Sequence, residues 1–251
     1  MMPAEFEFAN GAEKLHARIT RVLARRVVEA EGTGEPLAFP KEADLSAQLG
    51  VSRTVVRESM KVLADKGMVR MKPRAGTRAR PRAEWRRLDP DILAWEAEVR
   101  PTAELLRNLC EVRLAIEPTA AGFAAVRAEE EELRAIEQTL ERRAAADSRA
   151  IETVIDLDLA FHSAIVAASH NPLLVELSTT IRGPMRTALA CTSRFASTLE
   201  LGLEGHRTLC EALRRRDPAA ARRAAEEAVG FAMLAVGKVF APRKEQDGEE
   251  L

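Results

Sequence analysis

The sequence predicts a mostly α-helical fold of two domains, and three observations support this. The 251-residue chain contains no Tyr, and residues that favour strands are sparse except near residues 68–79. From residue 101 onward, apolar residues recur at helical spacing between short breaks marked by Pro, Gly or Asn. The length is sufficient for two domains with separate cores. We therefore expect a two-domain helical protein whose N-terminal part carries one small hairpin.

The N-terminal part has the pattern of three successive helices. Apolar residues at helical spacing over residues 11–30 predict a first, supporting helix. Leu45 and Leu49 lie four residues apart and predict a short second helix, which Gly50 can end in a left-handed conformation. Ser52 then lies where a side-chain oxygen can cap a third helix.

The third helix is followed by a predicted hairpin. Residues 68–71 and 77–79 can pair as two strands around a basic turn at residues 73–76. Two helices joined by a tight turn and followed by such a wing are typical of a winged helix-turn-helix, which places one helix in the major groove of DNA. We therefore predict a DNA-binding domain over residues 11–80.

The charge distribution agrees with a DNA contact. Residues 11–80 carry 15 Lys and Arg against 8 Asp and Glu, whereas the whole chain has a net charge of −1. Recognition helices read bases mainly with their N-terminal residues, so Arg53, Thr54 and Arg57 are the best candidates, and the capping Ser52 can also face a phosphate. The alternative interpretation is an amphipathic helix pair whose basic surface binds no DNA.

The following segment, residues 81–100, continues a basic stretch that begins at Arg78, and it contains two prolines and two tryptophans. We expect this segment to link the two domains, and we expect Trp85 and Trp95 to pack one domain against the other, because large rings gain much from burial. Residues 101–240 predict an all-α helical bundle, and the charged residues 241–251 predict a disordered tail.

Composition excludes several classes of protein. No run of 18 apolar residues exists, and the N-terminus lacks a basic region followed by an apolar one, so we expect neither a membrane span nor a signal peptide. We therefore expect a cytoplasmic protein. The three cysteines have no CxxC spacing and are expected to be small buried apolar residues.

The predicted bundle contains one group of residues with potential chemistry. Asp158 and His162 are spaced i and i+4, so both face the same side of one helix, and His206 lies on a later helix. A carboxylate and imidazoles that converge inside a helical bundle can bind a first-row metal ion. The alternative is a simple Asp–His hydrogen bond in a core or at a surface.

Several motifs together resemble the GntR family of bacterial regulators, and the second half is similar to the FCD effector domain of its FadR branch. The resemblance covers residues 12–240. The motifs are FPKE at 39–42, LGVSRTVVRE at 49–58, EVRLAIEP at 111–118, DLAFH at 158–162, NPL at 171–173 and EGH at 204–206.

For the DNA-binding half, the resemblance implies a homodimer that binds a short palindromic operator. Six residues match DNA-contacting or wing positions of the family: Ser52, Arg53, Thr54, Arg57, Arg74 and Gly76. One position departs from the pattern, because Ala43 stands where many relatives have an Arg that touches DNA. The contacts near the start of the second helix are therefore expected to differ.

For the helical half, the resemblance implies a pocket for a small carboxylate such as a sugar acid. Arg113 matches an Arg that grips the carboxylate of the effector, although an ion pair with Glu117 is the alternative. The effector site would also include Asp158, His162 and His206, which match three of the four ligands that many relatives use for a divalent metal such as Zn or Ni. The fourth ligand position is Ala228, which cannot bind a metal.

Arg182 and Arg186 are further candidates for contacts to the effector. These patterns predict a ligand-responsive transcriptional regulator, a repressor that an effector releases from DNA, and not an enzyme. A metal-dependent enzyme is one alternative, but no general base or nucleophile is placed beside the predicted cluster. A helical interaction module with an incidental basic domain is the other.

Overall fold

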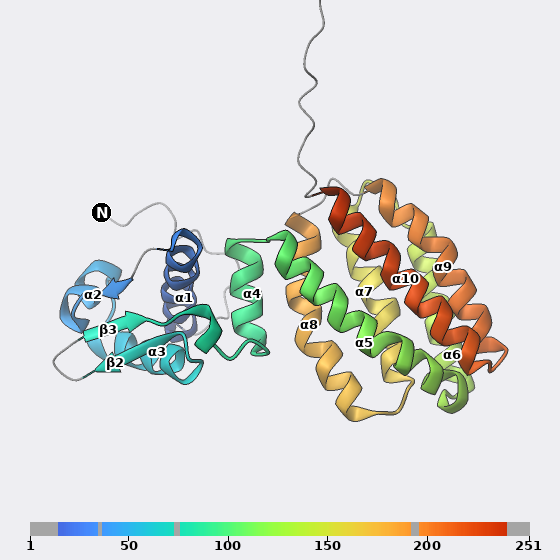
Figure 1. Cartoon of the computed structure of the whole chain (residues 1–251), viewed down its shortest axis with the longest axis horizontal. Helices are drawn as coiled ribbons and strands as arrows, with labels where there is room; N and C mark the ends of the chain where they lie inside the picture. Colours follow the sequence, from blue (N-terminus) through green and yellow to red (C-terminus); the bar gives the residue numbers. More distant parts are fainter. Residues whose placement is uncertain (1–14, 35–36, 73–75, 192–195, 240–251) are drawn as a thin grey trace, which may run out of the picture. The chain divides into compact units, whose positions relative to one another are not determined.

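The computed structural model describes residues 15–34, 37–72, 76–191 and 196–239 (Figure 1). The chain divides into two compact units, Met1–Arg100 and Pro101–Leu251. Helices dominate both units, and one small sheet lies in the first, so the predicted fold class is confirmed. No helix of the described ranges is long and apolar enough to cross a membrane.

The first unit combines four α-helices and a 3-10 helix with a three-stranded antiparallel sheet of order β1-β3-β2. The predicted wing is present as β2 and β3, and a short strand that precedes the second helix adds a third member. In chain order the elements of this unit are α1 Leu15–Thr33, β1 Ala38–Phe39, α2 Glu42–Leu49, α3 Arg53–Asp65, β2 Val69–Lys72, β3 Gly76–Ala79, η1 Arg82–Glu84 and α4 Pro90–Val99.

The turn between α2 and α3 follows from two residues. Gly50 has a φ of 65°, a left-handed conformation that costs a glycine little, and its N–H donates to the carbonyl of Ser46. Ser52 then caps α3, because its Oγ accepts a hydrogen bond from the N–H of Val55 at 3.3 Å. The turn and the cap together set the direction in which α3 leaves α2.

The core of the first unit includes both tryptophans. Trp85 is 4% exposed and Trp95 is 7% exposed, and both belong to the cluster that also contains Leu23, Leu63 and Ile92. Our expectation that these rings pack one domain against the other is therefore corrected: they complete the core of the first unit. Residues 81–100, expected to be a linker, contain η1 and α4.

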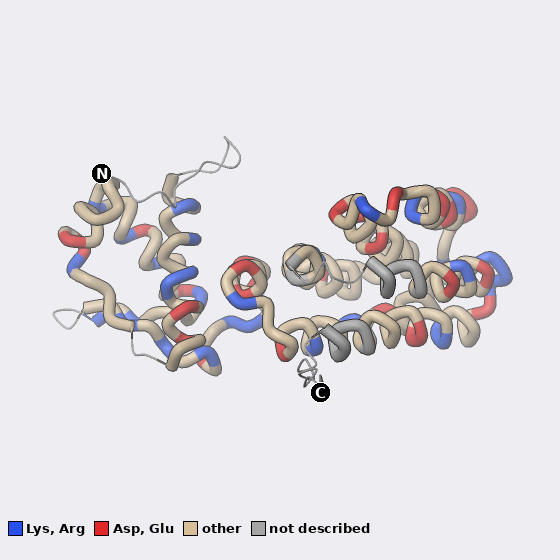
Figure 2. The backbone as a smooth tube through the Cα atoms, turned by 90° about the horizontal axis from the view of Figure 1, so that it is seen from above, with Lys and Arg blue, Asp and Glu red and all other residues tan. Residues whose placement is uncertain are grey.

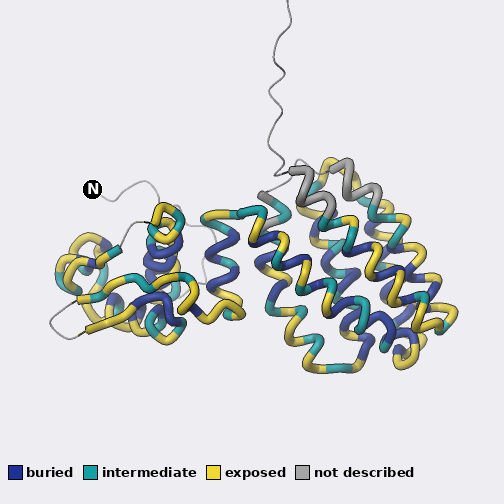
Figure 3. Tube along the Cα trace, in the orientation of Figure 1, coloured by how far each residue is buried: buried dark blue, intermediate teal, exposed yellow. Residues whose placement is uncertain are grey.

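The second unit consists of helices α5 to α10, with α5 packed against α7, α8, α9 and α10 (Figure 1). Buried and exposed residues alternate along these helices so that one stripe of each faces the interior (Figure 3). The helices are α5 Ala103–Arg127, α6 Glu130–Ala145, α7 Ile151–Ala167, α8 Pro172–Cys191, α9 Ala196–Arg214 and α10 Pro218–Val239. The expected tail, residues 241–251, lies outside the described residues.

Small side chains let the central helices lie close together. Ala121 and Ala125 of α5 share a buried cluster with Ala221 and Ala225 of α10. Because an alanine stripe permits a short distance between helix axes, these two helices form the tightest part of the bundle. Phe161 of α7 is fully buried in the same cluster and borders the polar group described below.

Candidate functional site

Helix α3 presents the predicted reading residues to solvent. Its apolar face, including Val56, Met60 and Leu63, is buried in the core of the first unit. Arg53 and Thr54 lie on the opposite, exposed face. Helix α3 is therefore held to its unit by one side while its N-terminal polar side remains accessible.

An ion pair that the sequence analysis did not predict joins α3 to α2. The guanidinium of Arg57 donates to Glu42 through Nη2 at 2.8 Å and through Nε at 3.2 Å. The arginine side chain is 58% exposed and the glutamate 33%. The hydrogen bond from Arg57 lowers the pKa of Glu42, and the same bond raises the pKa of Arg57. Glu42 therefore fixes a candidate DNA contact while remaining in reach of water.

The two candidate wing residues have different outcomes. Gly76 begins β3 with a φ of 83°, a conformation that strongly favours glycine. Arg74 lies outside the described residues.

Basic residues of β2 and β3 border a groove of about 300 Å³ on this part of the first unit, and Glu84 also lines this groove. Figure 2 shows how the basic and acidic residues are distributed along the chain. The groove lining includes Arg70, Lys72, Arg78 and Arg80.

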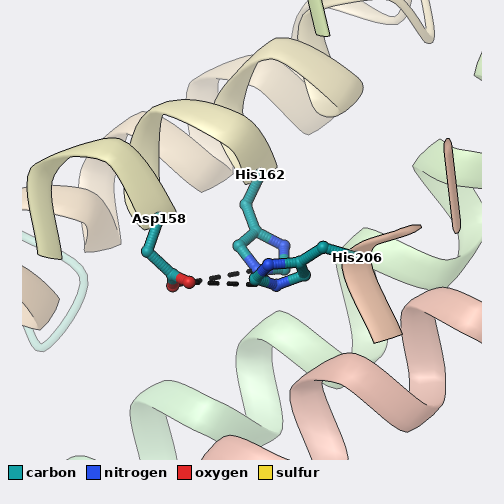
Figure 4. A group of neighbouring side chains, drawn as sticks. All are labelled: Asp158, His162 and His206. Carbon is teal, nitrogen blue, oxygen red and sulfur yellow. Dashed lines mark hydrogen bonds and ion pairs between the residues drawn. The ribbon is translucent and has the colours of Figure 1, made fainter. Parts of the chain in front are cut away.

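In the second unit, the structure brings Asp158, His162 and His206 together (Figure 4). One ligand atom from each lies within 4.8 Å of the others. The two Nε2 atoms of the histidines are 3.1 Å apart, and the carboxylate of Asp158 lies 3.9 Å from His162 and 3.8 Å from His206. The i and i+4 spacing on α7 and the packing of α9 thus produce the predicted cluster.

Helix α5 supplies two further members of this cluster. Glu117 accepts a hydrogen bond from Nδ1 of His162 at 2.8 Å, and its other oxygen accepts one from Nε of Arg113 at 2.6 Å. All three side chains are at most 8% exposed. Arg113 thus makes the alternative ion pair with Glu117, but it does so inside the bundle beside the histidines. The role of Glu117 was missed, although its spacing from Arg113 was visible in the sequence.

Helix α6 supplies a second buried arginine. Nε of Arg143 lies 3.8 Å from Oδ1 of Asp158, and the arginine side chain is 5% exposed. The sequence analysis missed this residue, which lies in a strongly charged helix. Periodicity offers a weak signal, since Arg143 follows the buried stripe of Ile136 and Leu140.

The surroundings of the cluster lower the pKa values of His206 and Asp158. Burial lowers the pKa of His206 to about 4, so this imidazole is neutral at pH 7. Burial would raise the pKa of Asp158, but the nearby histidines and arginines outweigh it and lower the pKa. The carboxylate of Glu117 accepts the Nδ1–H of His162, and the Nε2 atoms of His162 and His206 face each other. The cluster therefore places the Nε2 atoms of two imidazoles next to a carboxylate.

The remaining candidate residues contribute no ligand atom or ion pair to this cluster. Ala228 packs against α9 at Gly205, directly beside His206, and offers no ligand atom. Arg186 binds Asp156 at 2.6 Å on an exposed surface, and Arg182 is exposed on the same helix. Among the described residues, only Asp158, His162 and His206 form a group that could hold a metal ion.

Two sequence families match the chain. Residues 13–78 match "Bacterial regulatory proteins, gntR family", and residues 108–230 match the FCD domain. The chain is 32% identical to the galactonate operon transcriptional repressor of Escherichia coli over 83% of this chain and 90% of that protein. It is 30% identical to the uncharacterized HTH-type transcriptional regulator YieP of the same organism, over 90% and 96% of the two chains.

A solved structure has a similar fold. The structure titled "Lar controls the expression of the Listeria monocytogenes agr system and mediates virulence" superimposes with a TM-score of 0.61. The match covers 91% of this chain and 99% of that chain at 18% identity, so it supports the fold alone.

Proposed function

Since this chain belongs to the GntR family of bacterial transcriptional regulators and carries an FCD domain, we propose that it is a dimeric repressor that a small carboxylate releases from its operator. The matched family and relatives are regulators and not enzymes. We place the protein in the bacterial cytoplasm, where it can reach the chromosome. The proposal rests on one observation: the same chain holds the exposed N-terminal part of α3 and the polar cluster of Asp158, His162 and His206.

On the DNA side, two copies of α3 would enter successive major grooves of a two-fold symmetric site. Arg53 and Thr54 would contact base edges, and Ser52 would face a phosphate together with the N-terminal N–H groups of α3. Arg57 would contact DNA from its position beside Glu42. Arg74 and Gly76 would place the wing against the backbone.

On the effector side, we propose a sugar acid or a related hydroxycarboxylate. One relative is named for galactonate, which is a sugar acid, and the cluster here has the chemistry to bind such a molecule. Arg113 uses Nε and Nη2 toward Glu117, and its guanidinium has three further N–H donors that can bind a carboxylate. The imidazoles of His162 and His206 would bind hydroxyl groups of the ligand.

The donor atoms of this cluster match those that a divalent ion takes, because three ligand atoms converge and Glu117 orients one of the histidines. The buried guanidinium of Arg143 beside Asp158 opposes such an ion. When Zn²⁺ or Ni²⁺ is bound, Asp158, His162 and His206 would hold it, and it would act as a Lewis acid toward an effector oxygen. The fourth position would belong to water or to the effector, since Ala228 has no ligand atom.

Release from DNA requires that the effector bind one conformation of the dimer better than another, since only differential affinity can shift an equilibrium. The cluster joins residues of α5, α6, α7 and α9, so a ligand that enters it contacts several helices at once. We propose that the ligand-bound bundle favours a spacing of the two DNA-binding units that does not fit the operator.

The test is fluorescence anisotropy with DNA from upstream of the gene, at physiological salt, against a scrambled duplex of the same length. We expect at least about a thousandfold preference for the specific site. A thermal-shift screen of aldonic, uronic and hydroxy acids, with and without Zn²⁺ or Ni²⁺, would identify effectors, and a true effector should also weaken operator binding. Equal affinity for both duplexes would remove the regulator proposal.

A further inference from the structure

Arg143 places a second positive charge inside the polar cluster. It projects from α6 to within 3.8 Å of Asp158 Oδ1 while its side chain is 5% exposed. Arginine side chains carry a positive charge in proteins, and a guanidinium in such a place loses most of its hydration. The neighbouring Arg142 is exposed, so the two consecutive arginines of α6 have opposite surroundings.

The two carboxylates of the cluster already have positively charged neighbours. Arg113 is paired with Glu117, and Arg143 lies beside Asp158. Two guanidinium groups therefore lie beside two carboxylates in a region that water hardly reaches. A divalent cation bound at Asp158 would lie close to the charge of Arg143 in a medium of low dielectric constant.

We infer that the guanidinium of Arg143 supplies at Asp158 the positive charge that a divalent ion would otherwise supply, so that the cluster needs no metal to fold. This inference rests on the proposed effector site. It specifies that the positive charge beside Asp158 is a guanidinium and not a metal ion. Oδ1 of Asp158 is the oxygen nearest to Arg143 and also the one nearest to Nε2 of His206. An ion bound to that oxygen and that nitrogen would meet Arg143 as a like charge.

The alanine at the fourth ligand position also disfavours a bound metal ion. Ala228 packs on α9 at Gly205, the residue before His206, and contributes no further donor that could offset the repulsion. A site with three protein ligands and an adjacent guanidinium therefore binds a divalent ion more weakly than the same three ligands alone. Arg143 thus decides between a metal-dependent and a metal-independent cluster.

The test compares Arg143→Met with Arg142→Met in the full-length protein. Methionine keeps an unbranched apolar stem that reaches about as far as Nε of arginine and removes the charge, and Arg142 offers the same change at an exposed position. We expect Arg143→Met to bind Zn²⁺ at least about tenfold more tightly than the wild type, measured by competition with a chromophoric chelator. Its melting temperature should fall in EDTA and recover when Zn²⁺ is added.

Arg142→Met should bind Zn²⁺ like the wild type and melt at the same temperature with and without EDTA. If Arg143→Met binds Zn²⁺ no better than Arg142→Met does, the inference is wrong. Ni²⁺ provides a second probe, since imidazole ligands bind both ions. The operator assay is separate from this test, so failure of the inference would leave the regulator proposal intact.

A double variant keeps the inference testable if Arg143→Met fails to fold. Arg143→Met combined with Asp158→Asn removes both charges of the pair and also removes a metal ligand. We expect this double variant to melt at a higher temperature than either single variant, and to show no recovery with Zn²⁺. Additive losses in the double variant would mean that the two side chains do not compensate each other.

Discussion

The two units each hold an arginine that donates Nε and Nη2 to a glutamate, and the two pairs differ mainly in their exposure to water. The Arg57 side chain in the DNA-binding unit is 58% exposed, whereas that of Arg113 in the bundle is 5% exposed. The partners Glu42 and Glu117 both have lowered pKa values. Both pairs use the same donor atoms of arginine, and two features distinguish them: burial, and the additional hydrogen bond that Glu117 accepts from His162.

Burial decides whether such a pair can change partners. In water, a phosphate can replace Glu42 as the partner of Arg57, because solvent screens both charges and the exchange costs little. Inside the bundle, loss of Glu117 would leave Arg113 charged and without compensation. The exposed pair therefore suits a surface that must bind and release DNA, and the buried pair suits a fixed support for His162.

The largest expected effect is on stability. Glu117→Gln removes the charge of the carboxylate but keeps its shape, so the buried Arg113 loses its counter-charge and His162 loses its strongest acceptor. We expect the free energy of unfolding to fall by about 3–5 kcal/mol, measured by urea denaturation of the full-length protein. Glu111→Gln, at an exposed position of the same helix, is the control and should change stability by less than about 0.5 kcal/mol. Equal stability of the two variants would show that the buried pair contributes little.

The next effect is on DNA affinity. Arg53→Ala removes an exposed side chain at the start of α3 and leaves the core of the unit unchanged. We expect operator affinity to fall by roughly 5- to 150-fold if Arg53 reads a base, with unchanged melting temperature. Arg207→Ala, an exposed arginine of the second unit, should bind the operator like the wild type.

The salt dependence sharpens this prediction. An arginine that contacts only a phosphate should weaken binding to all sequences alike and reduce the salt slope by about one. An arginine that reads a base should instead relax specificity at one position of the operator. An Arg53→Ala protein with wild-type affinity would remove this residue from the interface.

The parts of the fold that the sequence predicted well are set by local chemistry. Gly50 ends α2 and Ser52 caps α3 through interactions within a few residues, so both can be read from the sequence. The spacing of Asp158 and His162 likewise predicts that they share a helix face, and the structure places them together with His206. These features follow from helical periodicity and from the preferences of single residues.

The parts that were missed depend on packing between distant segments. Arg143 reaches Asp158 only because α6 lies on α7, and the charged sequence of α6 separates it from Arg142 only through its place in line with the apolar stripe. The tryptophans were assigned to a domain interface because they follow the wing, but α4 folds back on α1 and brings Trp95 into the first core. A sequence pattern indicates that a side chain will be buried, but it does not show which distant element that side chain will pack against.

The smallest expected effect concerns the exposed pair. Glu42→Gln removes a negative charge that lies beside the proposed DNA-contacting face and weakens the hold on Arg57, whose guanidinium is then free to meet a phosphate. We expect operator affinity to rise by roughly two- to fivefold at low salt, with the gain shrinking as salt screens the charge, while the melting temperature stays near that of the wild type. Glu58→Gln is the matched control and should give a smaller rise, because Glu58 lies on the same exposed surface but pairs with Lys61 and makes no hydrogen bond to Arg57. A loss of affinity in Glu42→Gln would mean that the glutamate orients Arg57 for a specific contact, and the exposed pair would then act as a rigid support, as the buried pair does for His162.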